Sequence, residues 1–274
     1  MKNEILFKGY ILSISVLLLF SIVIGLARSA ESMKQEMKSS YQNSVQVSKL
    51  GYFIDDISGD IQNLVSVNYK MNNASSDTYN VSISDNITIN KMAFLANYSS
   101  FLQGYGNVTG ANISFSYSDP LTINFSNGMR YISPFNRYYV LFRNSSNSSQ
   151  ASRYDIAVYS NRSYSNYNEW GWAPSGTFVS VYYSDPTRSF TTSGYINPAF
   201  LNTFIIRYSG GQEVRIYAGT IDGIRNSIEV NQTSLVYLTF VSINATMPSA
   251  LPASYNMGLN ISYLNTNYSA SVPA

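Results

Sequence analysis

The side chains that most often carry catalysis are missing, because the 274-residue chain contains no histidine and no cysteine. Their absence excludes Ser-His-Asp and Cys-His nucleophilic sites, zinc fingers, histidine-ligated haem and disulfide bonds. A catalytic site would need a pair of carboxylates of the kind that glycosidases use. No spacing singles out two of the carboxylates available, which are Asp155, Glu169, Asp185, Glu213 and Asp222. We therefore expect no enzyme, no metal site and no cofactor.

One stretch, residues 168–172, combines two tryptophans with a carboxylate and an amide. Aromatic rings can stack on the C–H face of a sugar while polar groups bind its hydroxyls. The stretch lies in the widest interval without an N-glycosylation acceptor, residues 162–230. We expect it to contribute to a face that binds glycans or a partner protein. The residues of this expected face are Glu169, Trp170, Trp172 and Tyr182. The alternative is that the two tryptophans anchor a core.

Asparagine in the Asn-x-Ser/Thr context is the most frequent chemical pattern. It accounts for 14 of the 29 asparagines, whereas the serine and threonine content predicts about six by chance. The chain is poor in charge, with 12% charged residues and a net charge of +2. Glycans would supply the hydration that charged side chains usually provide. The acceptors are Asn73, Asn80, Asn86, Asn97, Asn107, Asn112, Asn124, Asn144, Asn147, Asn161, Asn231, Asn244, Asn260 and Asn267. The pattern indicates an extracytoplasmic, glycosylated body.

Near the amino end, the nineteen residues 9–27 carry no charge and lie between Lys8 and Arg28. As a helix they would span about 28 Å, close to the hydrocarbon thickness of a bilayer. A secretory signal peptide is the alternative, but its apolar region is usually shorter. We expect a charged leader over residues 1–9 and a retained transmembrane helix over residues 10–27.

A second helical segment is predicted over residues 28–66, where apolar residues recur at steps of three and four. They are Val47, Leu50, Ile54, Ile57, Ile61 and Leu64. Such a seam favours packing on one partner surface. The neighbouring aspartates Asp55, Asp56 and Asp60 lack the spacing of a calcium loop and are expected on the solvated face.

This arrangement, an apolar helix continuing into an amphipathic one and then a β-rich head, resembles type IV pilin-like proteins, and the archaeal members most nearly. Lys8-Gly9 before the apolar run is similar to the site that prepilin peptidases cleave, and the resemblance implies Tyr10 as the first mature residue. It also implies polymerisation through the apolar helix. Ile14 stands where many bacterial pilins carry Glu, and an ordinary single-pass surface glycoprotein has the same pattern.

From residue 70 to residue 274 the pattern changes to short alternating runs separated by turn signals. We expect about ten strands in a β-sandwich or jelly roll, with hairpin turns at Asn127-Gly128 and Gly210-Gly211. Residues 91–103 are expected to form a helix. The polar loop at residues 144–150 is a candidate internal boundary.

Together these patterns predict a structural or adhesive glycoprotein at the cell surface, anchored by a single span with its carboxyl-terminal domain outside. The alternative is an anchored carbohydrate- or partner-binding module. The expected partners are the lipid bilayer, copies of the chain or other surface proteins, and glycans. The small net charge gives no reason to expect nucleic acid.

Overall fold

The computed structural model describes residues 2–75, 78–135, 139–144, 151–233, 237–248, 253–263 and 266–273. For residues 2–18, 42, 43, 46, 144 and 266 it describes the backbone alone. The chain forms two compact units, Met1–Asp55 and Asp56–Ala274.

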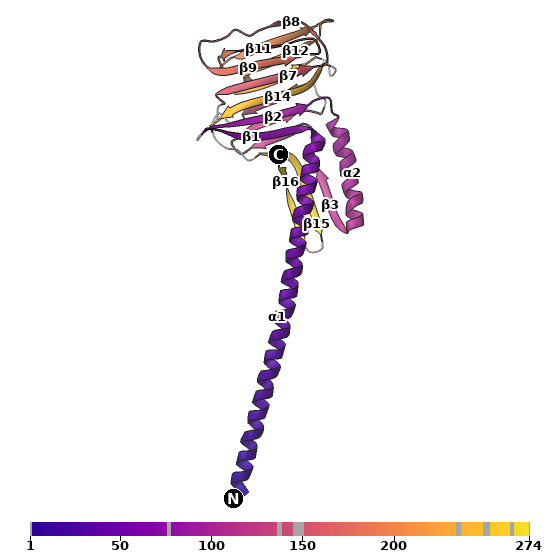
Figure 1. Ribbon diagram of the computed structural model, residues 1–274, viewed down its shortest axis with the longest axis vertical. Helices are drawn as coiled ribbons and strands as arrows, with labels where there is room; N and C mark the ends of the chain where they lie inside the picture. Colours follow the sequence, from indigo (N-terminus) through magenta and orange to yellow (C-terminus); the bar gives the residue numbers. More distant parts are fainter. Residues whose placement is uncertain are drawn as a thin grey trace. The chain divides into compact units, whose positions relative to one another are not determined.

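The first element is one continuous helix, α1 (Lys2–Val65), which begins at the indigo end of the chain in Figure 1. It confirms the predicted long amino-terminal helix and runs unbroken through Gly51 and Gly59. Between Leu19 and Leu26 the large apolar side chains are 51–65% exposed. Within the part of the chain that the structure describes, no helix has an apolar stretch long enough to cross a membrane. The side chains of residues 10–18 and of the predicted processing residues Lys8, Gly9 and Tyr10 lie outside the described set.

The second unit is mainly β, with two sheets packed as a sandwich, as the alternating pattern predicts. The six-stranded sheet has the order β1 (Val67–Ser75), β2 (Thr78–Asn86), β14 (Leu238–Met247), β7 (Arg153–Ser160), β9 (Thr177–Ser184) and β10 (Ser189–Ile196). The ten-stranded sheet has the order β16 (Thr266–Pro273), β15 (Ala253–Tyr263), β4 (Leu121–Phe125), β5 (Met129–Ser133), β6 (Tyr139–Asn144), β13 (Ile224–Gln232), β12 (Glu213–Ile221), β11 (Leu201–Tyr208) and β8 (Tyr164–Asn168), and β3 (Ala111–Ser116) also pairs with β15. All pairs are antiparallel except β7 with β9.

The described residues thus form sixteen strands, more than the ten or so expected. Both predicted hairpins are confirmed, because β4 pairs with β5 around Gly128 and β11 pairs with β12 around Gly210-Gly211. All three glycines have positive φ, between 84° and 101°, which is the backbone region that such turns require. Of the predicted boundary loop, residues 145–150 lie outside the described residues.

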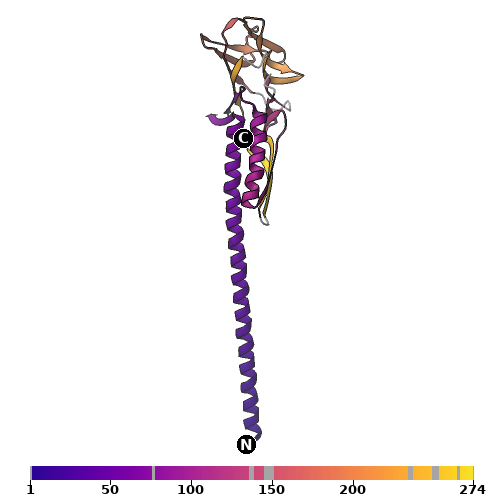
Figure 2. The same ribbon diagram turned by 90° about the vertical axis from the view of Figure 1, so that its right-hand side faces the viewer.

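The other helix, α2 (Lys91–Thr109), covers the predicted helical stretch and continues six residues beyond it. The Asn90 side chain accepts a hydrogen bond from the amide of Ala93, and Gly110 ends the helix in the left-handed conformation. Leu95 and Leu102 are buried. α2 lies beside the last turns of α1, residues 56–65, in both views (Figures 1 and 2).

Four buried tyrosines connect the two sheets of the sandwich through their hydroxyl groups. Tyr154 donates to the carbonyl of Asn226 at 2.7 Å, and Tyr255 donates to the carbonyl of Val67 at 2.7 Å. Tyr131 of β5 donates to Asp85 of β2, and Tyr183 of β9 donates to the Tyr208 hydroxyl of β11. Each ring fills the apolar interior while its polar end is satisfied on the opposite sheet. This explains how a chain with 24 tyrosines builds a core.

Candidate functional site

Three of the four residues of the expected binding face lie together, in the segment between β8 and β9. Trp170 is buried, and its ring packs edge-to-face on Trp172 and on Phe204, with centroids 5.7 and 5.6 Å apart. The Nε1–H of Trp172 donates to Glu169 Oε2 at 3.0 Å. The Trp172 ring also occupies the space beside Gly194, where a Cβ atom would lie 2.6 Å from Cε3. This glycine therefore makes room for the indole.

Tyr182 is not part of that group. It alternates along β9 with Val181 and Tyr183, which are buried between the sheets, so its side chain is on the outer face of the six-stranded sheet. There its ring meets that of Tyr159 at 5.7 Å. Gly194 pairs with Val179, which places the Trp172 ring on the inner side of the same sheet.

The aromatic residues around Trp170 mainly pack on one another. Tyr167 stacks on Phe190 at 4.3 Å and on Phe204 at 5.7 Å, and the rings of Phe190 and Phe204 are themselves 6.2 Å apart, so the three rings form one cluster. Trp170 Nε1 has no hydrogen-bond partner among the described residues. This arrangement favours the alternative that Trp170 anchors the core. Glu169 and the half-buried Trp172 are the more accessible residues of the expected binding face.

Four of the five carboxylates considered as catalytic candidates have a structural partner, and that of Glu169 is the Trp172 indole. Asp155 accepts two hydrogen bonds from Arg153 at 2.7 and 2.8 Å. Burial alone would raise the pKa of Asp185, but hydrogen bonds from Thr187, Tyr164 and Arg188 outweigh it and lower that pKa.

Glu213 lies between two arginines on the β11–β12 hairpin. Its oxygens are 3.0 Å from Arg207 and 2.7 Å from Arg215. The Arg215 hydrogen bond is the main reason that the pKa of Glu213 is lowered. Asp222 lies in the turn before β13, with a φ of 51°. Among the described residues, no group of three or more Asp or Glu side chains is arranged to hold a metal ion.

The acceptor asparagines share one property, which is access to solvent. Twelve of the fourteen have described side chains, and all twelve are exposed or partly exposed. In the strands β2 and β14 the alternate positions are buried, yet Asn80, Asn86 and Asn244 all occupy outward positions. Asn226, by contrast, is buried, hydrogen-bonds Thr177 and is not in an acceptor context. The side chains of Asn144 and Asn147 lie outside the described residues.

Three acceptors form a local group on neighbouring strands. Asn112 of β3 pairs with Ser262, Asn260 pairs with Ser114 and with Ser269, and Asn267 of β16 pairs with Ser262. Their side chains line one shallow groove. Glycans on these positions would cover the β3–β15–β16 face.

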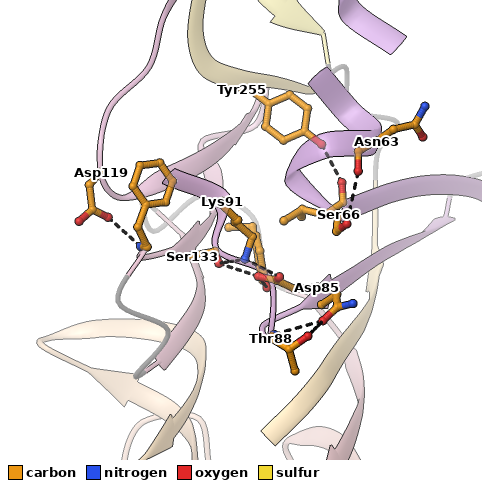
Figure 3. A network of polar contacts seen from close by, with 12 residues as sticks. Asn63, Ser66, Asp85, Thr88, Lys91, Asp119, Ser133 and Tyr255 are labelled. Carbon is orange, nitrogen blue, oxygen red and sulfur yellow. Dashed lines mark hydrogen bonds and ion pairs between the residues drawn. The ribbon is translucent and has the colours of Figure 1, made fainter. Parts of the chain in front are cut away.

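A buried polar cluster is the feature that sequence reasoning did not find (Figure 3). Lys91 Nζ lies 2.7 Å from Asp85 Oδ1, and both side chains are at most 1% exposed. Asp85 Oδ2 accepts from Tyr131 at 2.9 Å and from Ser133 at 2.6 Å. Lys91 Nζ also donates to Ser133 Oγ at 3.1 Å. The cluster joins β2, β5 and the first residue of α2.

One signal for the cluster was available in the sequence. Lys91 is the last lysine of the chain, and every cationic residue after it is arginine. Its position at the start of a helix did not by itself indicate burial.

No protein-family model, curated protein or solved structure matches this chain.

Proposed function

We propose that this chain is a membrane-anchored, extracytoplasmic glycoprotein with a structural or adhesive role, and that it is a pilin-like subunit of a filament. In this proposal residues 10–27 of α1 span the membrane before assembly and residues 28–66 form a stalk. The β-sandwich is the exposed, glycosylated head. No substrate is consumed, and the activity is assembly and contact.

The observation that carries the proposal is the outward placement of every described acceptor asparagine. A glycan can be attached only where the asparagine side chain projects from the protein surface into solvent. Accidental acceptors in a chain rich in serine and asparagine would not need to avoid the buried positions of strands such as β2 and β14. The 14 acceptors also exceed what composition predicts, about six.

The amino-terminal part of α1 supplies the second support. Its charge-free run, residues 9–27, includes the large apolar side chains between Leu19 and Leu26, which are more than half exposed. An apolar helix surface of this kind is costly in water and is stabilised by lipid or by neighbouring apolar helices. A pilin-like subunit uses both environments in turn, first lipid and then the helices of its neighbours.

The mass of the mature amino terminus, measured on protein isolated from the membrane fraction of the native cell, tests the pilin-like assignment. A start at Tyr10 is the expected result, because Lys8-Gly9 would be the processing site. An intact Met1, or a start near residue 30, contradicts pilin-like processing. Recovery of the chain in the cytosol contradicts anchoring as well.

A second candidate, a surface module that binds carbohydrate or a protein partner, is favoured by one observation. The outer face of β9 and β10 carries Phe178, Tyr182 and Tyr195 but no acceptor asparagine. Arg153 lies over the Phe178 ring at 4.7 Å and adds a cation to this face. Binding to an oligosaccharide panel that is lost in Tyr182→Ala and kept in Trp170→Phe would favour this candidate. Binding that is equally strong in both variants would exclude the outer face of β9 and β10 as the binding surface.

A further inference from the structure

The buried cluster of Lys91, Asp85, Tyr131 and Ser133 holds an amine against a carboxyl group in the absence of solvent (Figure 3). Lys91 Nζ is 2.7 Å from Asp85 Oδ1. Lys91 and Asp85 are 1% and 0% exposed, and they are the only ionisable Lys, Arg, Asp or Glu side chains buried in the described residues. Taking both charges out of water is expensive, so a bonding state of this pair without charge would lower that cost.

Transfer of one proton along the 2.7 Å contact from Lys91 Nζ to Asp85 Oδ1 gives a neutral amine beside a carboxylic acid. A neutral amine is a nucleophile, and a carboxylic acid is an acyl group that it can attack. Holding the two groups one hydrogen bond apart removes the entropic cost of bringing them together.

The two oxygens of Asp85 have different surroundings, and the difference matches the needs of acyl transfer. Oδ2 accepts from Tyr131 OH at 2.9 Å and from Ser133 Oγ at 2.6 Å. Two donors on one oxygen stabilise the negative charge that develops there when an amine adds to the carbon, as in an oxyanion hole. Oδ1 instead faces Lys91 Nζ, which can supply it with a proton as it leaves.

We propose that the side chains of Lys91 and Asp85 become joined by an amide bond. The Nζ–Cγ bond forms and the Cγ–Oδ1 bond breaks. Oδ1 leaves as water, carrying the proton of the carboxylic acid and one proton from Nζ, while Oδ2 remains as the amide carbonyl. No oxidant, reductant or external reactant is needed, and the chain becomes lighter by one water molecule.

The choice of lysine supports a covalent role over a purely ionic one. An arginine is better suited to a buried ion pair, because its planar guanidinium binds carboxylates through two parallel hydrogen bonds, but it cannot act as a nucleophile. After Lys70 every other cation of the second unit is arginine, and Lys91 is the single exception. Lysine also starts α2, where the helix dipole disfavours a positive charge, and amide formation removes that charge.

The test is the mass of the denatured full chain, produced in detergent in a host without N-glycosylation. We expect a mass lower than the sequence mass by one water. Trypsin should fail to cut after Lys91, so that residues 71–130 appear as one peptide that is also one water lighter. Lys91→Arg, which keeps the charge, should restore the full mass and the cleavage, whereas the matched control Lys70→Arg should keep the loss of water.

Two further measurements locate the bond. Asp222-Gly223 can also lose water by forming a succinimide, so the peptide Ile216–Arg225 must have its full mass. Ser133→Ala removes one donor from Oδ2 and should slow bond formation on the order of 100-fold in a time course after synthesis. A wild-type chain of full mass, cut by trypsin after Lys91, overturns the proposal whether or not any variant folds.

Discussion

At the scale of single residues, the sandwich depends on polar groups that are buried and satisfied. The hydroxyls of Tyr131, Tyr154, Tyr183 and Tyr255 each reach a partner on the other sheet. Such bonds stabilise modestly when made, but a buried carbonyl or carboxylate that loses its donor is costly. These tyrosines therefore fix how the sheets face each other as well as filling space.

Removing one hydroxyl should reveal this contribution. Tyr154→Phe keeps the ring but leaves the Asn226 carbonyl without its donor, so we expect the free energy of unfolding to fall by about 1–3 kcal/mol. Denaturant unfolding followed by circular dichroism measures the change. Tyr195→Phe, on the exposed outer face, is the matched control and should change stability by less than about 0.5 kcal/mol. Equal effects of the two variants would contradict the account.

High pH should destabilise the sandwich through the same tyrosines. Burial raises the pKa of all four phenols above 10.0, the value of an unperturbed tyrosine. Below pH 10 the phenols are protonated in both states, so the full stability is present. Above it the unfolded chain loses protons that the folded chain keeps, so stability falls by about 1.4 kcal/mol per phenol and pH unit.

Phenolate absorbance, recorded together with circular dichroism as the pH rises, checks this expectation. Ionisation of the last of the 24 tyrosines, these four among them, should coincide with unfolding. Complete ionisation of all tyrosines in a chain with an unchanged folded spectrum would show that the four phenols are accessible.

The Lys91–Asp85 pair gives a third expectation at this scale. Lys91→Met removes the contact to Asp85, and with it the proposed amide bond, and leaves a buried carboxyl group with hydroxyl partners alone, so we expect the free energy of unfolding to fall by about 3–5 kcal/mol. Lys70→Met removes an exposed cation from β1 and should leave stability nearly unchanged. Denaturant unfolding compares the two variants, and a Lys91→Met chain as stable as wild type would show that the pair does not stabilise the fold.

At the scale of elements, α2 carries an apolar stripe that its own sheet does not cover. Phe94, Phe101 and Val108 follow one another at intervals of seven residues and are 46%, 57% and 86% exposed. A seven-residue interval places side chains on one side of a helix. Tyr98, between the first two, donates to Asp60 of α1 at 2.8 Å, which fixes the side of α2 that faces α1. In the proposed filament the stripe is a surface for neighbouring subunits.

Polar substitutions on the stripe should weaken assembly and leave the fold intact. Burying one large apolar side chain contributes about 1.5–3 kcal/mol, so Phe101→Ser with Val108→Ser should raise the concentration needed for assembly at least about tenfold. Sedimentation and electron microscopy measure assembly. Val108→Ser keeps the acceptor sequence of Asn107, because Thr109 is unchanged. Gln103→Ser, on the other side of α2, is the control. Unchanged assembly in the double variant would exclude the stripe as a surface for neighbouring subunits.

Several strands could not be read from the sequence, because some of their inward positions are not apolar. In β2 the inward series ends at Asp85, whose burial is compensated by Lys91 of the next element and by two hydroxyl donors of β5. In β10 the inward positions include Thr192 and Gly194. A larger residue than glycine would not fit at position 194, because Trp172 occupies the space beside it. Both causes are tertiary contacts, which a local pattern does not contain.

The candidate binding face was predicted in part for a similar reason. Glu169, Trp170 and Trp172 are neighbours in the sequence, so their proximity follows from the chain itself. Tyr182 and Tyr183 are adjacent aromatics on one strand, and nothing in the sequence tells which of them is inward. The structure buries Tyr183 and turns Tyr182 outward.

At the scale of the whole molecule, the composition and the surface give one consistent account. Only 12% of the residues are charged, and glycans on the 14 acceptor asparagines would replace charge as the source of hydration. In the proposed function, glycans would keep the chain dispersed outside the cell, while its apolar amino-terminal run would hold it at the membrane or in a filament.

Glycopeptide mass spectrometry of the native protein tests the central claim most directly, because attachment of glycans requires export from the cytoplasm. The account predicts N-linked glycans on the exposed acceptors, including the Asn112, Asn260 and Asn267 group, and none on Asn226. Unmodified asparagine at every acceptor position would contradict it.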